Sequence, residues 1–338
     1  MTMNIRNIAA GASPVEPADP TAGVAARFHT EPFATPEDRE AACRLPVDRR
    51  QWMIQNLIVK YKVFNTAFQQ IARNHMPVAG GTHSQGTVGA MLGESRAGKS
   101  AVCRYYAATH APSYDDEGEI FPVVHMTASL RMTPVEFAHE INRLTASRYM
   151  RATGGIGAYV NNALLRLLRV RTQLLIIDDA QYLFFDRTDK TAASMFKLVK
   201  TIADFDALSV VLVGEERIND YVYSIDAFAN RGYNWEVIKP LTAGKNDMEK
   251  FGKLLGSIDR RLPFANLSGL DDPYIAEHLY RYSEGMIGRV MNILRPAAFN
   301  ALSDGSSHIR IEHLRTAIST RLRKGETFSY FGLDRDAA

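Results

Sequence analysis

The sequence predicts an α/β fold: a parallel P-loop sheet core flanked by helices, followed by a C-terminal all-α domain. Between residues 46 and 241, short apolar runs alternate with stretches of helical periodicity. Such alternation is typical of a parallel sheet that helices cover on both faces. A glycine-rich phosphate-binding motif follows the first apolar run, and beyond Pro240 helical stretches continue without strands.

The composition is that of a globular protein long enough to bury a sizeable core. Of the 338 residues, 46% are apolar and 23% are charged. The net charge of +3 neither indicates nor excludes a nucleic-acid partner. Two cysteines support no disulfide framework and cannot form a zinc site alone. Because the sequence has no secretory signal and no apolar run near the ~18 residues of a membrane span, we expect a soluble cytoplasmic protein without a membrane partner.

The first half of the chain predicts an arm and an α/β core. Residues 1–45 are rich in Ala, Pro, Gly and Thr and lack periodicity, so we expect a flexible N-terminal arm. The core is assigned to residues 46–241. It opens at 46–75 with apolar residues at helical spacing, which predicts one long helix with at most one break. Apolar strands are predicted at 87–92, 119–128, 173–181 and 208–216, with helices between them.

The second part predicts a small helical domain and a tail. Residues 242–323 contain four helical stretches, at 245–258, 272–283, 287–304 and 310–322. The tail, 324–338, carries Phe328, Tyr330 and Phe331. These aromatic residues either dock on a partner or pack back on the helical domain of their own chain.

The motif G-x-x-x-x-G-K-S lies between the first strand and a helix, which is the context that phosphate binding requires. Glycines allow backbone N–H groups to wrap around phosphate oxygens, and the helix N-terminus adds its positive dipole end. Lys99 is predicted to reach the β- and γ-phosphates of ATP, and Ser100 to bind Mg²⁺. The residues predicted to hold the nucleotide are Gly93, Glu94, Ser95, Arg96, Ala97, Gly98, Lys99, Ser100 and Ala101.

Two acids end the predicted strand at 173–181. Asp178 is predicted to hold Mg²⁺, directly or through water, and Asp179 to polarise the attacking water. The alternative is that these two acids only end a solvated strand. The matching glycine-rich loop upstream makes this the weaker interpretation.

These motifs together resemble an AAA+ ATPase. The ordered set is the glycine-rich loop, LLIIDDAQ, VVLVGEE, an arginine after a short helix, and SEGMIGRVMNIL in the helical domain. Within that superfamily the sequence resembles transposition regulators of the TnsC/TniB type, which share a role with MuB. The resemblance covers about residues 46–320 and implies that the helical domain, 242–323, is a lid over the nucleotide.

The resemblance implies roles for two arginines. Arg231 matches the arginine finger that reaches the γ-phosphate in a neighbouring subunit, and a guanidinium suits this because it keeps its charge and forks onto phosphate oxygens. Arg289, which follows Gly288, matches the lid arginine that senses the nucleotide of its own subunit. For either residue the alternative is an ordinary surface arginine.

Two positions depart from the family pattern. The catalytic acid is usually glutamate, and Asp179 retracts the carboxylate by ~1.5 Å, a displacement of the size that can cost ~100-fold in rate. We therefore expect slow hydrolysis. Glu215 stands where a small polar residue is usual; it either points away from the phosphates or this role is lost.

Two loops are the predicted DNA contacts. The resemblance places the loops 127–132 and 184–190 on the inner surface of a ring or helical assembly, with Arg131, Arg187 and Lys190 as phosphate contacts. Such contacts carry no sequence information, and each of these residues is equally well a solvated charge. Because each subunit offers few contacts, assembly driven by ATP would control DNA affinity.

We therefore expect an ATPase that regulates DNA transposition. It would oligomerise on double-stranded DNA as a ring or helical filament, with ATP and Mg²⁺ as cofactors. Its partners would be a transposase and a target-selection protein of the TniQ/TnsD type. The alternatives are another DNA-associated AAA+ ATPase (a replication initiator or helicase loader), an ATP-switched scaffold with negligible turnover, and a P-loop small-molecule kinase.

Overall fold

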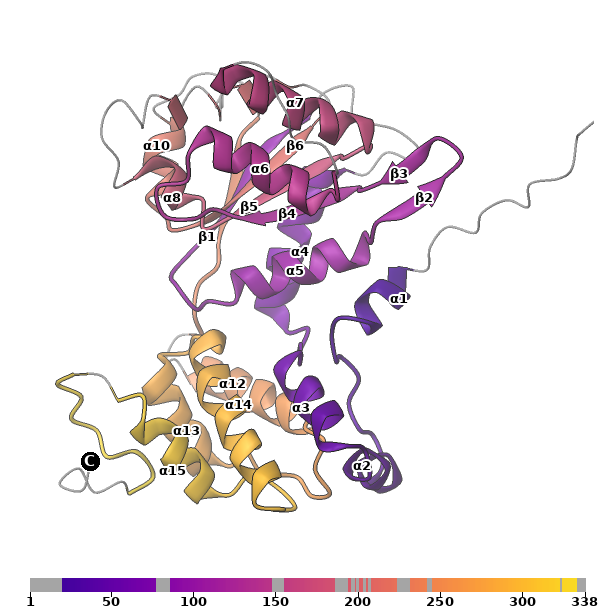
Figure 1. Ribbon diagram of the computed structural model, residues 1–338. Coiled ribbons are helices and arrows are strands. Elements are labelled where there is room, and N and C mark those ends of the chain that lie inside the picture. The colour runs from indigo at the N-terminus through magenta and orange to yellow at the C-terminus, as the bar shows by residue number, and fades with distance from the viewer. Residues whose placement is uncertain are drawn as a thin grey trace, which may run out of the picture.

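The computed structural model consists of an α/β body and a helical domain that lie one above the other (Figure 1). The structure describes residues 20–76, 86–147, 155–185, 194–195, 198, 201–202, 205, 208–223, 232–241, 245–322 and 324–332. Within these ranges, no helix is long and apolar enough to cross a membrane.

A parallel sheet forms the centre of the α/β body, as predicted, but it has five strands where four were expected. The strand order is β4-β5-β6-β1-β7, and all four neighbouring pairs are parallel. The unexpected strand is β7, which has no apolar run and whose side chains are exposed or half-buried. The strands are β1 (Val88–Leu92), β4 (Val123–Thr127), β5 (Leu174–Asp178), β6 (Ser209–Gly214) and β7 (Asn234–Val237).

Helices cover both faces of the sheet, and the strands alternate between two apolar clusters. Ala90 and Leu92 pack on the face covered by α6 (Pro134–Leu144) and α7 (Ile156–Arg169). Met91 packs on the other face, against α4 (Lys62–His75) and α5 (Lys99–Thr109). Short elements complete the body: the antiparallel hairpin β2 (Ser113–Asp115) and β3 (Gly118–Ile120), α8 (Gln181–Phe184) and α10 (Ile218–Tyr223).

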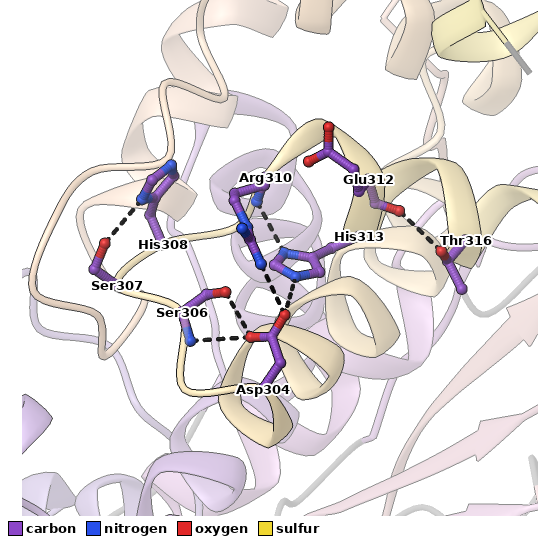
Figure 2. Close-up of polar contacts among 8 residues, drawn as sticks. All are labelled: Asp304, Ser306, Ser307, His308, Arg310, Glu312, His313 and Thr316. Carbon is purple, nitrogen blue, oxygen red and sulfur yellow. Dashed lines mark hydrogen bonds and ion pairs between the residues drawn. The ribbon is translucent and has the colours of Figure 1, made fainter.

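The C-terminal domain contains the four expected helices. They are α12 (Lys245–Asp259), α13 (Pro273–Ser283), α14 (Ile287–Ser303) and α15 (Ile311–Ser319), and they share one apolar cluster. The turn between α14 and α15 is held by Asp304, whose carboxylate accepts hydrogen bonds from Ser306, Arg310 and His313 (Figure 2). Ser306 and His313 hold the pKa of Asp304 well below its usual range, so this carboxylate stays ionised.

Between residues 33 and 55, the segment before α4 packs on the helical domain, whereas residues 24–28 pack on the α/β body. Residues 20–45, expected as part of a flexible arm, contain α1 (Pro20–Ala25) and α2 (Pro36–Cys43), and α3 (Val47–Gln55) follows. The Arg39 guanidinium is buried and donates to the carbonyls of Asp259 and Phe264. Ile54 belongs to the apolar cluster of the helical domain. Residues on both sides of the predicted boundary at residue 46 therefore pack on the helical domain. The predicted helix at 46–75 is therefore broken once, between α3 and α4.

The aromatic tail packs back on its own helical domain, which is one of the two expected alternatives. Tyr330 and Phe331 are 2% and 1% exposed. The Phe331 N–H donates to His278 Nδ1 at 2.9 Å, and Arg315 Nη2 donates to the Phe331 carbonyl at 2.7 Å. Both polar backbone groups of this buried residue therefore have partners.

Replacing Phe331 with alanine is expected to lower the free energy of unfolding of the helical domain by about 3 kcal/mol, because the side chain is fully buried. Urea denaturation followed by circular dichroism measures this. The control is Phe328→Ala, which removes a half-buried ring and should cost clearly less. Equal losses in the two variants would contradict the burial of Phe331 as the cause.

Candidate nucleotide site

The glycine-rich loop, residues 93–98, joins β1 to α5 in the geometry that the motif predicts. Gly93, Arg96 and Gly98 have φ values of 142°, 69° and 99°. A Cβ at Gly93 would lie 2.5 Å from the Ile238 carbonyl oxygen, so only glycine fits there. The loop thereby turns the chain sharply into the N-terminus of α5, where backbone N–H groups and the helix dipole favour an anion.

Lys99 lies at the centre of the loop. It is 8% exposed, and its ammonium donates to the carbonyls of Gly93 and Glu94 at 2.8 Å each. Burial lowers the pKa of Lys99, and the charges of Asp178 and Asp179 offset this only in part. A phosphate oxygen in the loop would therefore give the buried ammonium a stronger partner than two neutral carbonyls.

Asp178 ends β5 directly beneath the loop and is 3% exposed. Burial alone would raise its pKa, but the contacts with His125 and Ser100 outweigh burial and hold the pKa of Asp178 below its ordinary value. His125 Nε2 lies 3.6 Å from Asp178 Oδ2, which is too long for a hydrogen bond.

This donor set fits a magnesium ion bound together with a phosphate. Ser100 and Asp178 offer a hydroxyl and a carboxylate oxygen, both hard ligands that Mg²⁺ accepts. Within the described part of the chain, no group of three or more His, Cys, Asp or Glu residues could hold a metal ion. The remaining ligands would have to be phosphate oxygens and water, which is the usual arrangement for Mg²⁺.

Asp179 has a left-handed backbone, with φ of 53°. Among non-glycine residues, Asp and Asn tolerate this conformation best. Gln181 Nε2 donates to Asp179 Oδ1 at 3.1 Å and so holds the carboxylate in place. Gln181 is 4% exposed, and its Oε1 has no hydrogen-bond partner among the described residues. The sequence analysis assigned Gln181 no role, although it belongs to the LLIIDDAQ motif.

Glu215 does not present a free charge to the loop. Its Oε2 lies 2.7 Å from Arg217 Nε, although Glu215 also lines the cavity described below. The Arg217 guanidinium stacks over the Phe185 ring, 4.4 Å from its centroid. Arg217, two residues further along the chain, thus pairs with Glu215. The negative charge of Glu215, which was expected to repel phosphate, therefore has a positive partner.

A cavity of about 460 Å³ lies between the loop and the helical domain. Its lining contains the loop together with Lys99, Asp178 and Asp179. It also contains an apolar set from residues 57–64, where the chain leaves α3 and enters α4. Charged and apolar residues in one cavity suit the phosphates and the base of a nucleotide.

Arg295, not Arg289, is the α14 arginine that lines this cavity. Arg289 pairs with Glu284 and is absent from the cavity lining. Arg295 follows Ile287 and Met291 on the cavity face of α14, four residues apart each time. Its Nε is buried without a hydrogen-bond partner in the described chain, and burial and the charge of Arg104 lower its pKa. This four-residue spacing is the sequence signal that would have identified it.

The helical domain touches the loop directly. The Gly288 N–H donates to the Arg96 carbonyl at 2.9 Å, and a Cβ at Gly288 would lie 2.5 Å from that oxygen. Close approach of the two backbones therefore requires glycine here.

Replacing Gly288 with alanine is expected to weaken nucleotide binding about tenfold, because the methyl group pushes α14 away from the loop at a cost on the order of 1–3 kcal/mol. Titration with a fluorescent ATP analogue measures this. Gly252→Ala is the matched control, since no atom lies within 4 Å of its Cβ position. Unchanged affinity in Gly288→Ala would mean that contact between α14 and the loop does not shape the site.

Of the three predicted DNA contacts, only Arg131 lies within the residues that the structure describes. Arg131 is exposed in the loop after β4, with φ of 58°. Arg187, Lys190 and the predicted finger Arg231 lie outside the described residues.

Comparison with known proteins supports the fold. Residues 82–222 match the family model of an AAA domain. Among solved structures, the chain is similar to the Orc1 protein of Aeropyrum pernix in complex with DNA, with a TM-score of 0.54 and 17% identity over 76% of this chain and 64% of that one. It is also similar to Cdc6p from Pyrobaculum aerophilum (TM-score 0.53, 14% identity, 78% of this chain and 68% of that one). The ORC2 protein of Aeropyrum pernix in its ADPNP-ADP complexes gives a TM-score of 0.53 and 13% identity, over 75% of this chain and 67% of that one.

These similarities establish the AAA+ P-loop fold with a C-terminal helical lid. The chain spans less than two thirds of the length of the Orc1 protein that it matches. No curated protein sequence matches the chain. The AAA domain supports nucleotide binding and ATPase activity in general.

Proposed function

We propose that this AAA domain protein is an ATP-driven switch that assembles on double-stranded DNA and regulates transposition. The observation that carries the proposal is the cavity between the loop and the lid, whose lining brings together Lys99 and Asp178 of the core with Arg295 of the lid.

ATP would bind with its phosphates at the loop. Lys99 would then exchange its carbonyl partners for phosphate oxygens, and Ser100 and Asp178 would hold Mg²⁺. The base would lie against the apolar residues of the lining, among them Ile58 and Val59. Asp179 orients the attacking water, and its short side chain keeps turnover slow.

The lid senses the bound nucleotide through residues of α14. Arg295 comes from the lid, while Lys99 comes from the core, so a triphosphate between them joins the two domains electrostatically. Loss of the γ-phosphate removes charge from this junction and loosens the lid. Arg231, supplied by a neighbouring copy, completes the site in the assembled state.

DNA is the track on which the assembly forms. One copy offers few phosphate contacts, with Arg131, Arg187 and Lys190 as candidates, and binds DNA weakly. An ATP-bound homo-oligomer, ring or filament, multiplies these contacts. The assembled protein then marks a target and recruits a transposase, with a target-selection protein of the TniQ/TnsD type as a further partner; this role rests on the resemblance to TnsC/TniB-type regulators.

A second candidate function is replication initiation. It is favoured by the fold similarity to an Orc1 protein solved in complex with DNA. Both candidates require a nucleotide-dependent complex with duplex DNA, and they differ in the protein that is recruited.

The test is assembly of the purified protein on duplex DNA with ATP, ADP or no nucleotide, followed by analytical ultracentrifugation and electron microscopy. We expect DNA-bound oligomers with ATP and their loss with ADP. Protein that stays monomeric with ATP and DNA would overturn the proposal. Recruitment of a transposase, rather than a replicative helicase, by these oligomers separates the two candidates.

A further inference from the structure

We infer that the open edge of β4 is a docking site for an acidic, extended peptide segment of a partner protein, which adds to the central sheet as a further strand. The inference goes beyond the proposed function, which assigns this edge no role. Strand β4 comes first in the order β4-β5-β6-β1-β7, so only its β5 side is paired. Its other side presents unpaired backbone groups beside a cationic and apolar hollow.

The backbone of β4 leaves two residues free to pair on its outer side. At even positions the backbone pairs with β5: the Pro122 carbonyl accepts from the Leu174 N–H, and the Ala128 N–H donates to the last residue of β5. Because successive residues of a strand direct their backbone groups to opposite sides, the N–H and C=O of Val123 and His125 point outward. Within the described ranges these four groups accept or donate no hydrogen bond. Unpaired groups at a sheet edge are a template for another strand.

A hollow of about 500 Å³ lies at this edge, and its lining includes Val123, Val124 and His125. Val124 packs on the face of the sheet that α6 covers, whereas Val123 packs on the opposite face, with α5. Figure 1 shows α6 and α5 on opposite sides of β4. The hollow therefore extends around the edge from one face to the other. Side chains of an added strand, which alternate between the two faces, would find space on both.

The chemistry of the hollow selects acidic and apolar side chains. Arg27 and Arg104 line it, and none of its described lining residues is acidic. Arg27 is exposed, and Arg104 donates to the Ser100 carbonyl, which is neutral. The two positive charges therefore have no counter-charge in the hollow. Half-buried Phe28 and Phe121 add apolar surface beside them.

An extended peptide is the occupant that satisfies all of these features. Val123 and His125 are two residues apart, so their outward groups repeat about every 6.6 Å, which is the repeat of a β-strand. DNA phosphates would match the two arginines, but they would leave the apolar rings and the backbone N–H groups without partners. In strand addition, main-chain hydrogen bonds provide affinity and side-chain pockets provide specificity.

The test selects ligands without assuming their sequence. A random peptide library is displayed against the full-length protein without ATP or DNA, and the selected peptides are synthesised and titrated by fluorescence anisotropy. We expect them to combine acidic and apolar residues. Arg27→Glu should weaken their binding at least about tenfold, because it replaces an attraction by a repulsion. Arg27 does not line the nucleotide cavity. The matched control is Arg169→Glu, exposed on α7, which should bind the peptides as the wild type does.

Backbone methylation of the peptide tests strand addition itself. Two versions of one selected peptide carry N-methyl groups on alternate amides, in opposite phase, with the same side chains. The version methylated on the side that faces β4 should lose at least about tenfold in affinity, because it cannot donate to the edge, and the other should lose clearly less. Bound peptide should also slow hydrogen exchange at the Val123 and His125 amides. Equal affinities of the two methylated versions would overturn the inference.

The remaining outcomes separate this inference from the proposed function. A library that yields no binder sensitive to Arg27→Glu would overturn the inference and leave ATP-dependent assembly on DNA untouched. If Arg27→Glu lowers DNA affinity and leaves peptide affinity unchanged, the hollow binds DNA and the inference is wrong. If the wild type does not assemble on DNA with ATP but binds the selected peptides as expected, the proposed function fails and the docking site stands.

Discussion

Replacing Lys99 with alanine is expected to weaken ATP binding by about 10- to 100-fold, because a buried ammonium that makes charge-assisted hydrogen bonds to phosphate contributes about 1.5–3 kcal/mol. The Lys99 side chain is 8% exposed and already directed at the loop, where Gly93 and Glu94 accept its hydrogen bonds. The site therefore loses its main fixed positive charge without any gain elsewhere. Equilibrium titration with a fluorescent ATP analogue measures the loss.

Two controls make this result specific. Lys253 is exposed on α12 and pairs only with Glu249 among the described residues, so Lys253→Ala should bind ATP as the wild type does. Thermal unfolding without nucleotide should show that Lys99→Ala is folded. ATP affinity within twofold of the wild type in the folded variant would show that the loop does not hold the phosphates.

Replacing Asp179 with asparagine is expected to lower the rate of ATP hydrolysis about 100-fold or more, in the range for loss of a general base, while ATP binding stays near the wild-type level. Asparagine tolerates the left-handed backbone at φ of 53° as well as aspartate does, so the change removes charge without altering the chain path. The variant should form ATP-dependent assemblies on DNA that no longer disassemble. Phosphate release under single-turnover conditions, together with assembly lifetime, measures both effects.

A companion variant tests whether the short acid limits turnover. Asp179→Glu moves the carboxylate toward the phosphates, but glutamate is less favoured at a positive φ and loses the fit to Gln181. Faster hydrolysis in this variant would identify the protein as a switch slowed by its short acid. Equal hydrolysis by the wild type and by Asp179→Asn would instead mean that Asp179 is not the base.

The parts of the site that depend on local chemistry could be predicted from the order of the amino acids. The strand, glycine loop and helix at 87–110 are specified by adjacent residues: an apolar run, glycines that reach positive φ at 93 and 98, and a following helix. Asp178 at the end of a buried strand is equally local, because an acid directly after the apolar run LLII is expected at the carboxyl end of the strand. Such features need no knowledge of distant contacts.

Features that depend on which elements contact one another become visible only in the folded chain. The strand β7 exists because its backbone pairs with β1, although its side chains show no strand pattern. The choice of Arg295 over Arg289 depends on which face of α14 turns toward the loop, and the Gly288–Arg96 contact sets that rotation. Helix α2 joins the helical domain because Arg39 finds carbonyl partners more than 200 positions away in the chain. Backbone pairing, helix rotation and long-range hydrogen bonds all depend on residues that are distant in sequence, and one sequence read locally does not contain them.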